Sequence, residues 1–141
     1  MKKITLLTLI VALFTITGCK KDKDNDKENS SSIQGRWLAT SLVEISYENG
    51  VEEGRDDDTS DNLWVEFKAD GTGMSQTDRD GQSSFTYTIK NNELVIKFED
   101  ETDKYQIKSL TNSDLHLYQE ESETSDGVVY KEVVEIKLKK R

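Results

Sequence analysis

The chain has 141 residues, of which 19 are basic and 28 acidic, giving a formal net charge of −9. Such a surface repels nucleic acid and anionic membrane faces, and no basic stripe with interleaved aromatic side chains argues otherwise. The single cysteine excludes an intrachain disulfide and a thiolate metal cluster, so an apolar core alone must hold the folded part together.

The chain begins with the pattern of a signal peptide, residues 1–18, followed by Cys19. Lys2 and Lys3 supply the positive start, and the apolar stretch 4–17 is shorter than the ~20 residues of a membrane-spanning helix. Its last residues before Cys19, Ile-Thr-Gly, resemble the lipobox of bacterial lipoproteins. The resemblance implies that Cys19 becomes the mature N-terminus and carries acyl chains such as palmitate. The alternative is an ordinary secretory signal with a cysteine beside its cleavage site.

Lys20 follows the cysteine, and in bacterial lipoproteins an aspartate at this position favours the inner membrane. The resemblance therefore implies a lipid-anchored protein of the outer membrane. Residues 20–32 contain only Lys, Asp, Asn, Glu and Ser, so we expect residues 19–32 to include the lipidated cysteine and a flexible linker. The charged run also resembles tags for the cell surface, and both the periplasmic and the cell-surface face stay open.

Residues 33–141 predict one all-β domain. Apolar and polar residues alternate with a period of two, as in antiparallel strands with one buried and one wet face. The alternating segments are 43–47, 63–67, 85–89, 94–98, 105–107, 115–117 and 134–138, with a further strand at 72–77. Asp-Gly and Asn-rich pairs between them fit tight turns. We expect about eight strands that close into a small antiparallel up-and-down barrel, with a β-bulge near Glu132, where the last strand breaks phase.

Two short motifs give this domain a family resemblance. Gly35-Arg36-Trp37 is a Gly-x-Trp signature at the head of the first strand, and residues 67–72 run from a strand into an Asp-Gly hairpin. With the meander that follows, the chain resembles the lipocalin-like domains of bacterial outer-membrane lipoproteins. The resemblance implies that Trp37 plugs the closed end of the barrel, beneath a basic residue from the C-terminus, and that the open end holds a ligand pocket. Three residues are candidates for the basic partner: Lys137, Lys139 and Arg141.

The inward-facing side chains allow two interpretations. They form either the wall of a pocket for a small hydrophobic ligand or the core of a filled barrel, and an eight-stranded barrel admits both. The predicted inward set is Val43, Ile45, Leu63, Val65, Phe67, Phe85, Tyr87 and Ile96.

Two features are expected outside the barrel. Trp64 alternates with Leu63 and Val65, so it should lie on the outer face as a contact surface, or be half-buried beneath the neighbouring loop. That loop is predicted over residues 48–62, where it would overhang the open end. Its carboxylates could in principle hold Ca²⁺, but their spacing does not match an EF-hand, so we expect a solvated loop. They are Asp56, Asp57, Asp58 and Asp61.

The sequence offers little for catalysis. It has no phosphate-binding loop, nucleophile elbow or Cys/His cluster, and its one histidine, His116, has no evident partners. We therefore expect a non-enzymatic binding module of the bacterial envelope, without a cofactor or a metal. Two functions stay open: uptake of a small hydrophobic ligand, or a filled barrel that docks on an envelope protein through Trp64 and the acidic loop.

Overall fold

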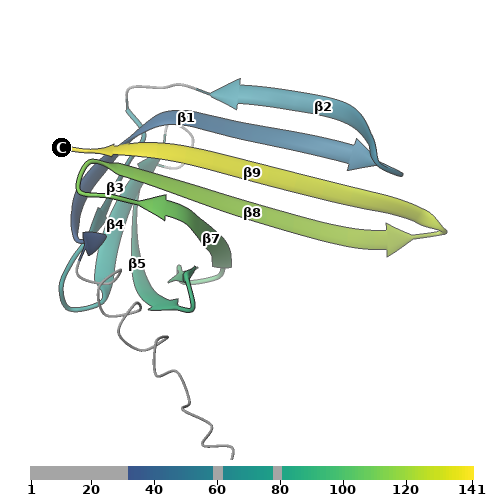
Figure 1. The fold of residues 1–141 in the computed structure, drawn as a ribbon. Helices are drawn as coiled ribbons and strands as arrows, with labels where there is room; N and C mark the ends of the chain where they lie inside the picture. The colour runs from purple at the N-terminus through teal and green to yellow at the C-terminus, as the bar shows by residue number, and fades with distance from the viewer. Residues whose placement is uncertain (1–31, 59–61, 78–80) are drawn as a thin grey trace, which may run out of the picture.

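A computed structural model describes residues 32–58, 62–77 and 81–141. The predicted signal peptide, Cys19 and Asp61 lie outside these residues. No helix in the described part of the chain has the length and apolar character needed to cross a bilayer. Within the described ranges, nine strands form one antiparallel sheet (Figure 1). The strands are β1 (Gly35–Glu48), β2 (Val51–Asp58), β3 (Trp64–Phe67), β4 (Thr72–Thr77), β5 (Gly81–Lys90), β6 (Glu93–Lys97), β7 (Thr102–Leu110), β8 (Asp114–Ser125) and β9 (Val128–Lys140).

Eight of these strands close into a barrel, which confirms the predicted fold. Each strand from β3 to β9 pairs with its neighbour in sequence. The barrel closes because the first half of β1 pairs on one side with β3, through Gly35–Leu38, and on the other with the end of β9. Closure leaves no free sheet edge around this part of the molecule, which protects it from edge-to-edge aggregation.

The ninth strand, β2, lies outside the barrel, so the prediction of a loop over residues 48–62 is wrong. Val51–Asp58 pairs with the second half of β1 in a hairpin that turns at Asn49 and Gly50, with φ angles of 49° and 82°. β8 and β9 also run past the barrel, and the four strand segments form a sheet that projects from it (Figure 1). We call this sheet, residues 44–58 and 119–134, the extension. The sequence of β2 does not alternate because both faces of a single-layer sheet meet water.

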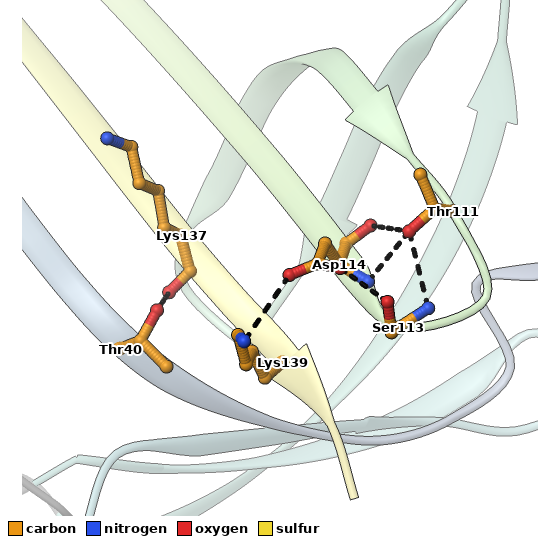
Figure 2. Close-up of polar contacts among 6 residues, drawn as sticks. All are labelled: Thr40, Thr111, Ser113, Asp114, Lys137 and Lys139. Carbon is orange, nitrogen blue, oxygen red and sulfur yellow. Dashed lines mark hydrogen bonds and ion pairs between the residues drawn. The ribbon is translucent and has the colours of Figure 1, made fainter.

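A β-bulge in β1 separates the barrel from the extension. The register between β1 and β9 shifts between Ala39 and Ser41, leaving Thr40 as the extra residue. The Thr40 hydroxyl donates to the carbonyl oxygen of Lys137 at 3.1 Å and fixes the bulge against β9 (Figure 2). An extra residue reverses the alternation of the strand that contains it.

This reversal corrects the predicted inward set. Trp37 and Ala39 face the interior before the bulge, and Leu42 faces it afterwards. Val43 and Ile45 therefore lie on the outer face, and the prediction that they line the barrel is wrong. Their regular alternation with polar residues predicts an inward position, because this pattern does not reveal a phase change upstream.

The bulge predicted near Glu132 is absent. Pairing between β8 and β9 runs without a shift from Asp114 opposite Lys139 to Ser125 opposite Val128. Glu132 keeps the phase of Ile136, but it belongs to the extension and is exposed there. The strand stays regular because it has left the barrel before the carboxylate is reached.

The closed end of the barrel is filled around Trp37, which is fully buried. Its indole Nε1 donates to the carbonyl oxygen of Ile33 at 2.6 Å. Lys140 covers the ring, with Nζ 5.0 Å from the ring centroid and 3.1 Å from the carbonyl oxygen of Ser32. The basic partner of Trp37 is thus none of the three predicted candidates. Lys140 shares the inner face of β9 with the buried Leu138, whereas Lys137 and Lys139 alternate to the outside and are exposed.

The turn between β7 and β8 ties down the start of β8 beside β9. The Asp114 N–H donates to the Thr111 hydroxyl at 2.9 Å, and the Asp114 carbonyl accepts from the Thr111 N–H at 2.8 Å. Lys139 Nζ lies 4.0 Å from the Asp114 carboxylate, a contact that is largely exposed (Figure 2). These bonds satisfy the backbone of the turn and hold the barrel strands in register.

Candidate functional site

A cavity of about 210 Å³ occupies the interior of the barrel on the side from which the extension leaves. It begins where the aromatic core ends. Phe85 packs edge to face against Phe67 and Phe98, with ring centroids 5.6 Å apart in both pairs. Most of the wall is apolar. The lining residues are Ala39, Leu42, Leu63, Trp64, Val65, Phe67, Ser75, Gln76, Thr77, Phe85, Ile96, Phe98, Asp103, Tyr105, Leu117, Ile136 and Leu138.

The structure gathers part of the predicted set at this cavity. Five of the eight predicted residues line it, namely Leu63, Val65, Phe67, Phe85 and Ile96. Tyr87 lies deeper in the core, 6% exposed, and its hydroxyl donates to the carbonyl oxygen of Lys68 at 2.7 Å. Val43 and Ile45 face away from the cavity, because the extra residue Thr40 reverses the alternation of β1. Tyr105, Leu117, Ile136 and Leu138 of the wall lie on β7, β8 and β9, at positions that the alternation predicts as buried. Ala39 and Leu42 of β1 also line the cavity and are not in the predicted set.

Asp103 is a charged residue of the cavity wall that the predicted set does not contain. β7 alternates inward through Asp103, Tyr105 and Ile107, and the first two pair with Ile96 and Leu94 of β6. The Tyr105 hydroxyl donates to Asp103 Oδ2 at 3.4 Å. A charged residue on the buried phase of a strand is the signal that could have identified this position.

Burial dominates the electrostatics of this pair. It raises the pKa of the Asp103 carboxyl, and the negative charges of Glu101 and Glu121 raise it further. Burial also raises the pKa of Tyr105 far above its ordinary value, reinforced by the charge of Asp103. The Tyr105 hydroxyl is therefore a neutral hydrogen-bond donor. The Asp103 carboxylate accepts this bond, and its burial costs it part of its hydration.

Trp64 has a covered position at the rim of the cavity. It pairs with Leu38 and Gln76, on the face opposite Val65, and its Nε1 donates to Gln76 Oε1 at 2.9 Å. The guanidinium carbon of Arg36 lies 3.8 Å from its ring centroid. The indole is half-buried, and this cation covers its ring.

The acidic segment does not form a cation site in the described residues. Asp56, Asp57 and Asp58 follow one another along β2, so their side chains alternate between the two faces of the extension. Asp57 pairs with Arg55, with Nε and Oδ2 3.2 Å apart. In the described ranges no three His, Cys, Asp or Glu side chains form a group that could hold a metal ion.

Comparison with known families supports the assignment of the fold. The family described as a lipocalin-like domain matches residues 33–117, which include most of the cavity wall. Searches of curated proteins and of solved structures return no match. The matched segment spans more than half of the chain and runs from the closed end into β8. The chain therefore belongs to the lipocalin-like domain family.

Proposed function

We propose that this protein is a lipid-anchored, non-enzymatic binding module of the bacterial envelope that takes up a small hydrophobic ligand in the barrel. The observation that carries the proposal is an apolar cavity in a barrel whose opposite end is filled by Trp37. Dry apolar cavities of ~150 Å³ bind benzene, so a cavity of this kind is large enough for a ligand. It is below the ~300 Å³ of typical drug-sized sites, which points to a small molecule with one ring or a short alkyl chain.

A titration with 2-phenylethanol, a neutral ligand of this size, tests the proposal. We expect saturable binding by isothermal calorimetry, and loss of binding in Val65→Trp, which fills the cavity. The control is Val43→Trp, which adds the same bulk on the outer face of β1. Absence of binding by the unmodified protein, or equal binding by both variants, contradicts ligand uptake in the barrel.

The anchor rests on the sequence of residues 1–19 alone. We expect a palmitate analogue to label the protein in bacteria and Cys19→Ser to abolish the label. The same substitution should release the domain from the outer-membrane fraction. Labelling that survives in Cys19→Ser would contradict acylation at this cysteine.

An accessory role, with docking on a neighbouring envelope protein, is the second candidate. It is favoured by the extension, a single-layer sheet that exposes Val51, Val129 and Tyr130 at 61%, 41% and 41%. The covered position of Trp64 moves the expected contact from that residue to the extension. Site-specific cross-linking from Tyr130 in cells, compared with the exposed Lys137 of the barrel, tests this role. Equal or absent cross-linking at the two sites would contradict it.

A further inference from the structure

We infer that the cavity selects small hydrophobic molecules with a cationic end, such as amines, and rejects those that end in a carboxylate. The inference rests on the proposed uptake of a ligand in the barrel and names the chemical class of that ligand. It comes from the carboxylate in the cavity wall and from the acidic residues of the neighbouring extension.

The described residues of the cavity wall include one carboxylate and no compensating cation. Among the described lining residues, Asp103 is the only acidic side chain, and none is Lys, Arg or His. Its one hydrogen-bond partner in the cavity, the Tyr105 hydroxyl, is a neutral donor 3.4 Å away. A carboxylate ligand would meet no countercharge here and would lose its hydration beside Asp103.

The approach to the cavity is acidic as well. The extension continues the barrel wall, because Glu44 on β1 is two residues beyond the lining residue Leu42, and Glu121 on β8 lies beyond Leu117. The charge of Glu44 acts on Tyr105, and those of Glu121 and Glu101 act on Asp103.

The remaining strands of the extension add carboxylates to the same face. Asp56 of β2 pairs with Glu44, and Glu132 of β9 pairs with Glu121. The basic side chains nearby turn to the other face. Arg55 is paired with Asp57, and Lys131 lies over the ring of Tyr47, with Nζ 4.5 Å from the centroid. These carboxylates favour the approach of a positively charged ligand over that of an anionic one.

An ammonium group would gain two interactions inside the cavity. It could form a charge-assisted hydrogen bond with Asp103, whose carboxylate lacks a cationic partner in the wall. Aromatic rings in the same wall, including Phe98 and Tyr105, favour cations over their faces. Burial raises the pKa of Asp103, and a bound cation would relieve that cost of ionisation.

Three probes of similar size separate charge from apolar contact: 2-phenylethylamine, 2-phenylethanol and phenylacetate. At pH 7 and low salt we expect the amine to bind at least about tenfold more tightly than phenylacetate, a difference of ~1.4 kcal/mol, with the alcohol between them. Asp103→Asn should remove most of the preference for the amine over phenylacetate.

The matched control is Asp126→Asn, which removes the same charge at the tip of the β8–β9 hairpin, far from the cavity. Asp126 has a φ of 52°, a conformation that asparagine tolerates well. This variant should retain the preference of the unmodified protein. Equal affinities for the amine and phenylacetate, or a preference unchanged by Asp103→Asn, would overturn the inferred selection by charge. If the alcohol still bound, the proposed ligand binding in the barrel would remain supported. Failure of all three probes to bind overturns both.

Discussion

The ring of Phe85 lies against the backbone of Gly73, its partner on the neighbouring strand β4. A Cβ atom at Gly73 would be 2.2 Å from two atoms of this ring and 2.5 Å from the carbonyl oxygen of Glu66. The absence of a side chain at this position therefore lets the ring lie flat on the sheet. From there Phe85 reaches both the aromatic core and the wall of the cavity.

Gly73→Ala should consequently destabilise the barrel. Because neither the ring nor the Glu66 carbonyl can move away easily, we expect the free energy of unfolding in urea to fall by about 1–3 kcal/mol, the usual cost of overpacking. Gly54→Ala is the control, since its Cβ would meet only the hydroxyl of Ser46, at 2.9 Å, and this group can rotate. Equal midpoints for the two variants would show that Phe85 accommodates the methyl group.

Deletion of Thr40 should cost little more than one hydrogen bond. Without the extra residue, Trp37 and Leu42 are four positions apart, so both still share the inner face of a regular strand. We expect the free energy of unfolding in urea to fall by about 0.5–1.5 kcal/mol, because the deletion removes the hydroxyl that bonds Lys137. Thr40→Ser keeps that hydroxyl and should unfold within ~0.5 kcal/mol of the unmodified protein. A loss of about 3 kcal/mol or more on deletion, comparable to emptying a core position, would show that the strand does not keep this phase.

Lys140→Ala should weaken the closed end. The substitution removes the cation over Trp37 and the hydrogen bond to the Ser32 carbonyl. We expect a loss of about 1–2 kcal/mol in urea unfolding followed by tryptophan fluorescence. Lys139→Ala removes the same charge from an exposed ion pair and should cost less than ~0.5 kcal/mol. A larger loss in Lys139→Ala than in Lys140→Ala would contradict the assignment of Lys140 as the partner of Trp37.

The difference in stability between Asp103→Asn and the unmodified protein should depend on pH. Burial raises the pKa of this carboxyl in the folded chain, so its ionised form destabilises the fold above that pKa, and the penalty disappears as pH falls below the ordinary value of 3.8. We expect the variant to melt higher than the unmodified protein at pH 7 and equally near pH 3. Asp103 is partly exposed, so solvent screening keeps the gain at pH 7 below about 1 kcal/mol. If Asp103→Asn melted lower than the unmodified protein at pH 7, while Asp126→Asn melted at the same temperature, the ionised Asp103 would not destabilise the fold.

Strand alternation predicted the barrel because its strands have one dry face and one wet face. The method failed where this contrast ends. β2 carries Val51-Glu-Glu-Gly-Arg-Asp-Asp-Asp with water on both faces, so it has no period to detect. Glu132 interrupted the apolar alternation of β9 for the same reason, although the strand itself is regular.

Within the candidate site, alternation identified the apolar wall on β3, β5 and β6. It could not locate the bulge at Thr40, because a single extra threonine looks the same as a regular strand residue until its pairing is known. The basic partner of Trp37, Lys140, could not be identified from the sequence for another reason. The predicted inward positions Ile136 and Leu138 already place Lys140 on the inner face of β9, but the choice required the register between β1 and β9.

The hydrogen bonds at Ser32 and Ile33 fix where the polypeptide enters the barrel. Both carbonyls are held beside Trp37, at the end remote from the cavity. If Cys19 carries the lipid anchor, the linker would join the domain at its plugged end, and the cavity would lie at the end away from this attachment point. A ligand could then enter the barrel without passing the linker.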